Sequence, residues 1–338
     1  MARQPLLDVQ DLKVEFWTAR GTIYAVNGVS FDIAPGETLG IVGESGCGKS
    51  VTSLAILGIL ARAAKVTSGT VLFDDRDLLK LSDEELRGVR GREIAMIFQD
   101  PMTSLNPVLT IGFQIQEVLR THFGMDKRDA ADRAAELLDR VGIPNASARL
   151  RDYPHQFSGG MRQRAMIAMA LACQPKLLIA DEPTTALDVT IQAQILDLLR
   201  ELVSEQDTAL ILITHDLGVV AGMCERVNVM YAGMFMETGT AEQVFAKPRH
   251  PYTLGLLQSV PRLDAARKTA LQPIEGNPRD MLSPPQACPF APRCRYEVEE
   301  STRSVPPLEQ VEPGHKLACF NPVPEDEWQK MREAALTA

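Results

Sequence analysis

The stretch that decides the fold is LGIVGESGCGKS at residues 39–50. Its first four residues predict a short buried strand, and the next eight, GESGCGKS at 43–50, place glycines among small and polar residues before a lysine and a serine. Glycines allow a turn so tight that successive backbone N–H groups point at one anion, and a following helix adds the partial positive charge of its N-terminus. The pattern G-x-x-x-x-G-K-[ST] after a strand therefore predicts a loop that binds nucleotide phosphates.

Each residue type in this loop has a chemical reason. Lys49 brings a positive charge to the β- and γ-phosphates, and the Ser50 hydroxyl is a suitable ligand for Mg²⁺. The alternative is a glycine-rich turn with a solvated lysine, but the flanking strand and helix favour the phosphate loop. We expect the nucleotide to contact the whole loop, which consists of Gly43, Glu44, Ser45, Gly46, Cys47, Gly48, Lys49 and Ser50.

Outward from this loop, short apolar runs alternate with helical segments. Residues 6–42 show the alternation of strands, and the runs KLLIAD at 176–181 and ALILITHD at 209–216 flank a helical segment that starts at Val189. This order is typical of an α/β fold in which helices cover a mostly parallel sheet. A helix-rich block at about 100–165 interrupts the order, so we expect an inserted helical subdomain there.

The composition changes near residue 255, where prolines become frequent and regular periodicity fades. We expect one domain at 1–255 and a loop-rich extension at 256–338. An extension of about 80 residues with few apolar runs stabilises itself poorly, which predicts that something staples it.

Composition and charge exclude several classes of protein. The 35 basic and 44 acidic residues leave a net charge of −9, which disfavours nucleic acid as a partner. The most apolar long run, 51–64, carries Arg62 and is too short for a bilayer span, and the N-terminus lacks the pattern of a secretory signal. Six cysteines are too few for a disulfide scaffold. We expect a soluble protein of a reducing cytoplasm, with any membrane role carried by partner chains.

A second chemical motif is LLIADEPT at 177–184. An apolar strand that ends in Asp181 places a carboxylate at the C-terminal edge of the sheet, where it can hold Mg²⁺ through water. Glu182 is then the natural general base for an attacking water; the alternative for both acids is a solvated loop or a helix start. Gln99 and His215 also follow apolar strands, so we expect them at the same edge.

The segment QFSGGMRQR at 156–164 resembles the signature motif of ATP-binding cassette ATPases. It lies between the phosphate loop and LLIADEPT, as in that family. TTALDVT then looks like the D-loop of the family, with Asp188, and His215 looks like its switch histidine. The resemblance covers about residues 6–240 and implies a P-loop ATP-binding cassette domain, with a mostly parallel sheet, some antiparallel strands and an inserted helical subdomain.

The resemblance implies that two cassettes face each other head to tail. The phosphates held by Lys49 of one cassette would be completed by Ser158, Gly159 and Gly160 of the other. A single chain is therefore expected to be half of the working enzyme.

The same resemblance implies ATP and Mg²⁺ as cofactors, with catalytic roles for Glu182, His215 and Gln99. Ser50, Gln99 and Asp181 are the expected Mg²⁺ set. Gln99 is also expected to relay the state of the nucleotide to a membrane partner. Phe16 stands where the family places an aromatic ring on adenine, with Trp17 and Tyr24 as alternatives.

Four further segments narrow the resemblance to the ATPase subunits of oligopeptide and dipeptide importers. They are FQDPMTSLNP at 98–107, YPHQFSGGMRQR at 153–164, ALDVTIQAQIL at 186–196 and HPYT at 250–253. The resemblance implies a second ATPase subunit, either a related chain or a copy of this one, two membrane permeases and an extracytoplasmic substrate-binding protein. It also implies a peripheral position on the cytoplasmic face of a bacterial or archaeal inner membrane.

Other functions stay open at this stage. Relatives in this subfamily also move nickel, glutathione or sugars, so the motifs do not name the cargo. A soluble ATPase that remodels nucleic acid or ribosomes is disfavoured, since such proteins carry two cassettes in one chain or a basic surface. A catalytically silent partner is disfavoured by Glu182 and by the intact signature.

The extension contains a group of cysteines, CPFAPRC at 288–294 and the Cys319 of GHKLAC. In the peptide-importer relatives, four cysteines here are thought to hold a [4Fe-4S] cluster; Cys288, Cys294 and Cys319 match three of them, and Ser301 stands in place of the fourth. One hypothesis is a cluster completed by Ser301, His315 or an exogenous group, and a second is zinc bound by the three thiols and His315. A third is a remnant whose cysteines only pack. A bound group would act as the staple of the extension.

Overall fold

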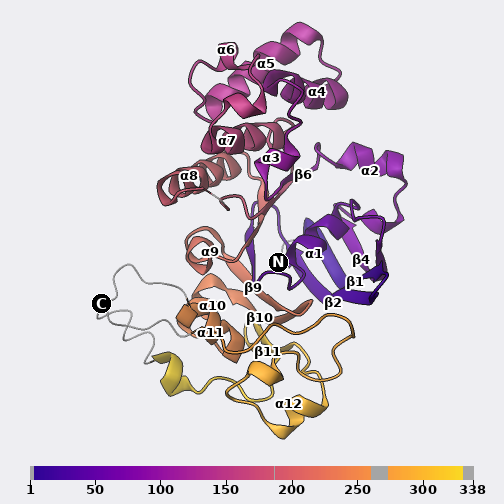
Figure 1. The fold of residues 1–338 in the computed structure, drawn as a ribbon, viewed down its shortest axis with the longest axis vertical. Coiled ribbons are helices and arrows are strands. Elements are labelled where there is room, and N and C mark those ends of the chain that lie inside the picture. The colour runs from indigo at the N-terminus through magenta and orange to yellow at the C-terminus, as the bar shows by residue number, and fades with distance from the viewer. Residues whose placement is uncertain (1–3, 186, 260–272, 330–338) are drawn as a thin grey trace. The chain divides into compact units, whose positions relative to one another are not determined.

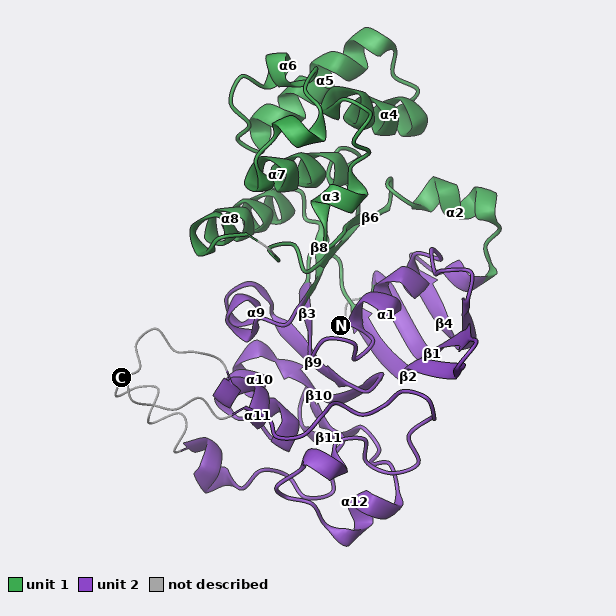
Figure 2. Cartoon of the chain, viewed as in Figure 1, with its two compact units in different colours: residues 1–5, 33–37, 80–213 green, residues 6–32, 38–79, 214–338 purple. Residues whose placement is uncertain are grey.

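The computed structural model describes residues 4–185, 187–259 and 273–329, and its chain forms two compact units that interleave in sequence (Figures 1 and 2). Unit 1 comprises residues 1–5, 33–37 and 80–213, and unit 2 comprises residues 6–32, 38–79 and 214–338. In the part of the chain that is described, no helix is both long enough and apolar enough to cross a bilayer.

Unit 1 contains three parallel strands in the order β8, β7, β6. Every residue of β7 and β8 is buried, which explains why both read as continuous apolar runs rather than as alternating patterns. The strands are β6 (Ile94–Ile97), β7 (Leu177–Asp181) and β8 (Ala209–Thr214). Parallel pairing brings the carboxyl ends of β6 and β7 to one edge, as expected for a ligand-binding sheet.

The helices of unit 1 begin at polar caps. Thr110, Asp126 and Ser158 each accept a backbone N–H at the start of a helix. Within the helix-rich block expected at about 100–165, Gly124 has φ +64° and ends α4, so that a separate helix, α5, follows. The helices are α2 (Asp83–Val89), α3 (Pro101–Ser104), α4 (Ile111–Phe123), α5 (Lys127–Arg140), α6 (Ala146–Arg149), η2 (Pro154–Gln156), α7 (Gly159–Ala170) and α8 (Val189–Glu205).

Unit 2 contains an antiparallel sheet in the order β2, β1, β4, β5 and a second set of strands in the order β11, β12, β10, β9, β3. Within the second set, β3 and β9 are parallel, whereas β9 with β10, β10 with β12, and β11 with β12 are antiparallel. The strands are β1 (Leu7–Thr18), β2 (Gly21–Ile33), β3 (Thr38–Val42), β4 (Ala64–Phe73), β5 (Arg76–Asp77), β9 (Arg226–Tyr231), β10 (Met234–Thr240), β11 (Glu309–Glu312) and β12 (His315–Leu317). The α/β class with additional antiparallel strands is confirmed.

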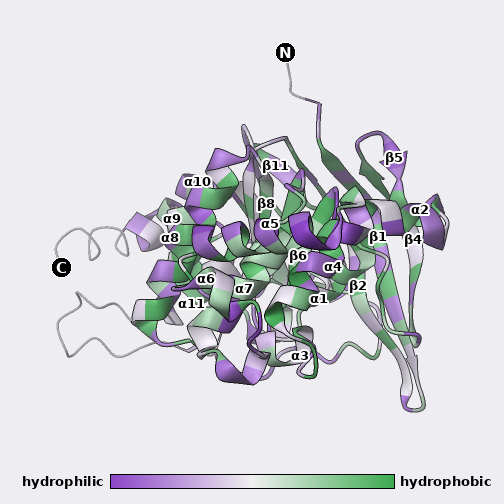
Figure 3. Ribbon diagram, turned by 90° about the horizontal axis from the view of Figure 1, so that it is seen from above, coloured by the Kyte–Doolittle hydropathy of each residue, from purple (hydrophilic) through white to green (hydrophobic). Residues whose placement is uncertain are grey.

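The helices of unit 2 are short. They are α1 (Lys49–Ile56), η1 (Leu78–Lys80, at the boundary with unit 1), α9 (Leu217–Met223), α10 (Ala241–Ala246), α11 (Pro251–Ser259), η3 (Ala291–Arg293) and α12 (Glu299–Arg303). Figure 3 shows that polar residues dominate α2, whose sequence is DEELRGV. The apolar run at 51–64 divides between α1 and the start of β4, which excludes one long helix there.

The extension is attached to unit 2 by strand pairing and by side chains. Its strand β12 pairs with β10, at Glu237 with Leu317 and at Thr238 with Lys316. The fully buried Glu237 accepts the backbone N–H groups of Arg249 and His250, and its carboxyl lies 2.8 Å from His315 Nε2. A second contact set consists of Leu254, Val323 and Trp328, with Tyr296 packed against it. These contacts provide the staple that the composition of the extension predicts.

Candidate functional site

The phosphate loop at 43–50 lies between β3 and α1 in unit 2. Gly43 and Gly48 have φ +155° and +110°, conformations that L side chains rarely adopt. A Cβ at Gly43 would lie 2.2 Å from Met230 O, and one at Gly48 would lie 2.5 Å from Ala25 O. The two glycines are therefore required both by backbone conformation and by the close approach of neighbouring backbone.

Lys49 is the buried cation of this loop, with a side chain folded back over it. Its Nζ donates to Gly43 O at 2.8 Å and to Glu44 O at 3.0 Å. Cys47, which lies beside it, is also buried, and burial raises the pKa of its thiol. Because the thiolate is the species that reacts, we expect alkylation of Cys47 to be slow even without nucleotide.

The acidic motif lies at the end of β7 in unit 1. Asp181 is buried, and Glu182 follows in a left-handed conformation with φ +46°; its backbone N–H donates to Ile213 O at 2.7 Å. Glu182 Oε2 accepts from Gln99 Nε2 at 2.9 Å and from Thr185 Oγ1 at 2.9 Å. The structure thus brings Gln99 and Glu182 together, as their places after β6 and β7 predict.

The signature segment opens helix α7. Ser158 is exposed and caps the helix, because its Oγ accepts the backbone N–H of Met161 at 3.3 Å. A Cβ at Gly160 would lie 2.8 Å from Ile191 Cγ2, so this glycine permits close packing against α8. Asp188 caps α8 by accepting the Ile191 N–H at 3.0 Å. Ser158, Gly159 and Gly160 therefore form a partly exposed helix N-terminus, which is a suitable environment for an anion.

The remaining predicted residues lie in unit 2. His215 is exposed directly after β8. Phe16 lies near the end of β1 and is partly buried, whereas Trp17 is 55% exposed and has Lys65 Nζ 6.0 Å from the centre of its ring. Tyr24 is partly buried in β2. These positions leave the assignment of Phe16 to adenine as a prediction.

The three cysteines of the extension lie near one another, but their surroundings do not complete a ligand set. Among the residues that the structure describes, no group of three or more His, Cys, Asp or Glu side chains has an arrangement that could hold a metal ion. Burial raises the pKa of all three thiols, to about 12 for Cys319, and the neighbouring thiols raise it further for Cys294 and Cys319. The arrangement of the described residues therefore supports neither the cluster nor the zinc hypothesis.

Both candidates for the fourth ligand have other partners. Ser301 Oγ donates to Val298 O at 2.6 Å and accepts the Val298 N–H at 3.0 Å. His315 is buried against Glu237. Position 301 is nevertheless next to the thiols, because Cys288 N–H donates to Ser301 O at 2.9 Å.

This arrangement predicts that Ser301→Cys raises the metal content of the protein. The unmodified chain is expected to contain far less than one iron or zinc atom, because its extension has one buried and two partly buried thiols and no fourth cysteine. The variant adds a thiol beside Cys288 and should gain iron with sulfide, or zinc, in anaerobically purified protein. Thr302→Cys adds an exposed thiol one residue away and is the matched control. Stoichiometric metal in the unmodified chain would show that three thiols suffice.

Three residues near the site were not found from the sequence. Thr185 lies three residues after Glu182, and only the turn at 182–185 shows that the two side chains meet. Tyr252 and Arg293 come from the C-terminal part of unit 2, yet both contact Glu44 of the phosphate loop. The sequence singles out HPYT, which contains Tyr252, for its family resemblance, and CPFAPRC, which contains Arg293, for its cysteines. Neither pattern predicts a contact with the phosphate loop.

A phosphate loop after a strand, and an acidic pair at the end of a parallel strand, define the class of P-loop nucleotide-binding proteins. Comparison with known proteins agrees. Residues 26–185 match the family described as ABC transporter, and residues 236–300 match the family described as oligopeptide/dipeptide transporter, C-terminal region.

Two curated relatives cover nearly the whole chain. The oligopeptide transport ATP-binding protein OppD of Escherichia coli is 55% identical over 320 residues, which are 95% of this chain and 94% of that protein. The dipeptide transport ATP-binding protein DppD of Bacillus subtilis is 56% identical over 318 residues, 94% of this chain and 95% of that protein. Among solved structures, the dimeric post-hydrolysis state of the ATP-binding cassette MJ0796 bound to ADP and Pi has a TM-score of 0.63 at 30% identity and covers 70% of this chain and 98% of that one. The chain belongs to the ABC transporter family of ATP-binding proteins.

Proposed function

We propose that this protein is the ATPase subunit of a membrane importer for di- or oligopeptides. The observation that carries the proposal is that one chain joins an ABC transporter cassette to the C-terminal region of oligopeptide/dipeptide transporters. The extent of the similarity to OppD and DppD supports the same assignment, because it covers both parts. In domain terms, the cassette corresponds to about 1–255 and the extension to 256–338.

The chemistry proposed is hydrolysis of Mg²⁺-bound ATP. Lys49 and the N–H groups of the loop at 43–50 bind the phosphates, and Ser50, Gln99 and Asp181 hold Mg²⁺ directly or through water. The cation neutralises charge on the phosphates when it is bound. Glu182 accepts the proton of the attacking water, in an orientation set by its two hydrogen-bond donors.

His215 and Asp188 are proposed to act at the same reaction, as the switch histidine and the D-loop acid. Ser158, Gly159 and Gly160 are proposed to contact the nucleotide of a partner cassette. Their partly exposed position at the start of α7 supports this role, because a helix N-terminus attracts an anion. The partner is a related ATPase chain or a second copy of this one.

The complex proposed contains two permeases and an extracytoplasmic substrate-binding protein, with this chain on the cytoplasmic face of the inner membrane. Its peptide cargo is tested by reconstituting the chain in vesicles with the permeases and the substrate-binding protein proposed as its partners. Labelled di- and oligopeptides should accumulate only when ATP is supplied, and excess unlabelled peptide should block the uptake. ATP-dependent uptake of nickel, glutathione or a sugar, without uptake of peptide, would contradict the proposed cargo and leave the ATPase assignment intact.

A further inference from the structure

The second residue of the phosphate loop, Glu44, is held by the C-terminal part of unit 2. Its backbone N–H donates to Tyr252 Oη at 2.8 Å. Its carboxylate accepts two N–H groups of the Arg293 guanidinium, at 2.6 Å to Oε2 and 3.0 Å to Oε1. The Arg293 side chain is only 5% exposed, so this is a sheltered bidentate pair rather than a surface ion pair.

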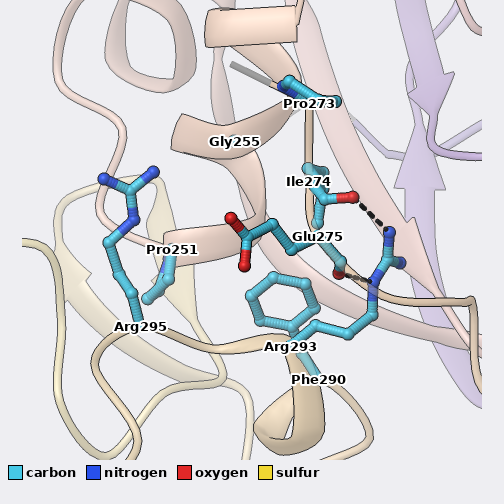
Figure 4. A pocket seen from close by; sticks show the side chains of 8 residues that line it. All are labelled: Pro251, Gly255, Pro273, Ile274, Glu275, Phe290, Arg293 and Arg295. Carbon is cyan, nitrogen blue, oxygen red and sulfur yellow. Dashed lines mark hydrogen bonds between the residues drawn. The ribbon is translucent and has the colours of Figure 1, made fainter.

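Arg293 is itself fixed by its surroundings. It ends the short turn η3 within CPFAPRC, and its Nε donates to Glu275 O at 3.0 Å while Nη2 reaches Ile274 O at 3.4 Å (Figure 4). Its guanidinium also lies 6.0 Å from the centre of the Phe290 ring. Figure 4 shows Phe290 beside the arginine, and its dashed lines join the guanidinium to the backbone oxygens of Ile274 and Glu275. A third N–H reaches Tyr231 Oη at 3.4 Å, so the guanidinium presents its two remaining N–H groups in one direction only.

The aromatic side chains behind the pair form a continuous support. Phe290 packs against Tyr252 with ring centres 5.3 Å apart and against Tyr231 with ring centres 5.4 Å apart. Tyr231 Oη accepts from Arg293 at 3.4 Å, and Tyr252 Oη contacts the loop itself. The phosphate loop is therefore held at two groups of Glu44: Arg293 of the CPFAPRC turn binds its carboxylate, and Tyr252, which packs on Phe290 of that turn, binds its backbone N–H.

This contact has two consequences for a loop that binds phosphate. First, three groups of Glu44 are held in place: its backbone N–H, its carboxylate, and its carbonyl, which accepts from Lys49 Nζ. A loop that is already ordered loses less conformational entropy when it binds a ligand. Second, an unpaired carboxylate in the loop would repel the triphosphate, whereas pairing with a guanidinium cancels that charge.

We propose that Arg293 is a positioning residue for nucleotide binding, which acts through Glu44 to hold the phosphate loop in its binding conformation and to neutralise the loop's own carboxylate. The C-terminal extension thus contributes to ATP affinity without contacting ATP. The inference rests on the proposed ATPase function and deepens it.

The test compares Arg293→Gln with Arg295→Gln in the full-length chain. Arg295 is in the same segment but bonds to Gln258 rather than to the loop, so it is the matched control. Arg293→Gln should weaken binding of a fluorescent ATP analogue about tenfold, roughly the value of one charge-assisted hydrogen bond, and should raise the KM for ATP more than it lowers kcat. Arg293→Lys keeps the charge but loses the bidentate geometry. Its affinity for the ATP analogue should lie between those of Arg293→Gln and Arg295→Gln.

Adding Glu44→Gln to Arg293→Gln should recover part of the lost affinity, because it removes the unpaired carboxylate. Equal affinity in the unmodified chain and Arg293→Gln, or an equal loss in Arg295→Gln, would overturn the role of Arg293. If Arg293→Gln does not fold, Arg293→Lys decides, and unmodified affinity in that variant overturns the proposal. Absence of ATP binding by the unmodified chain would instead contradict the ATPase function itself.

Discussion

Glu182→Gln is expected to abolish steady-state ATP hydrolysis while ATP binding is retained. A general base contributes about 10²- to 10⁴-fold to such a reaction, and the loss should be of that size. The glutamine has nearly the shape of the glutamate but cannot accept the proton of the attacking water. Phosphate release should therefore stop, and nucleotide bound to the protein should remain as ATP.

The environment of Glu182 makes this substitution a clean test. Its Oε2 accepts from Gln99 and from Thr185, and an amide oxygen in the variant can accept the same two bonds. Loss of activity is then not caused by collapse of the loop. Glu201→Gln removes one carboxylate from the exposed surface of α8 and is the control for net charge. Steady-state hydrolysis above about one tenth of the unmodified rate would remove Glu182 from its role.

Lys49→Ala is expected to weaken ATP binding by about 10- to 100-fold, since the variant loses at least one charge-assisted hydrogen bond to phosphate. In the absence of nucleotide, the buried ammonium group donates to Gly43 O and Glu44 O. These acceptors lie within the loop, so removal of the lysine also loosens it. Calorimetry with ATP and Mg²⁺ measures the loss of affinity, and a thermal melt without nucleotide measures the loss of stability.

Lys127→Ala is the matched control for this second experiment. Lys127 is an exposed lysine at the start of α5, where alanine is well tolerated. Nucleotide affinity in this control should equal that of the unmodified chain. Tight binding of ATP by Lys49→Ala would count against the phosphate loop as the nucleotide site, whatever its effect on the melt.

Arg293→Gln and Lys49→Ala probe the same loop from different sides. Lys49 is expected to contact the phosphates, whereas Arg293 reaches only Glu44. The expected loss for Arg293→Gln is at the lower end of the range for Lys49→Ala, because an ordering effect and a cancelled charge are weaker than a direct contact.

The sequence predicted the parallel strands, the phosphate loop and the acidic pair because each depends on neighbouring residues. Five consecutive buried residues in β7 appear as an apolar run, and Asp181 and Glu182 follow it directly. Gly43 and Gly48 are visible in the same way, since the backbone angles that they permit are a local property. The end of helix α4 has a local cause too, because Gly124 adopts the left-handed conformation that terminates a helix.

The extension was the part that the sequence described least well. Its proline-rich composition correctly predicts loops, and its cysteines suggested a bound metal as the staple. The structure instead shows β12 paired with β10, and His315, a candidate ligand, buried against Glu237. The partner of a histidine 78 residues away in the chain cannot be read from local spacing.

The sequence alone determined the class of the protein, the place of its phosphate loop and the acids that follow β7, because these depend on short segments whose order and spacing carry the chemistry. Only the tertiary structure decided what surrounds them. The contact between Glu44 and Arg293 joins residues 249 positions apart, and the Cys288–Cys294 segment that suggests a metal site delivers an arginine to the phosphate loop. Such contacts depend on how strands and turns pack in three dimensions, which residue spacing along the chain does not specify.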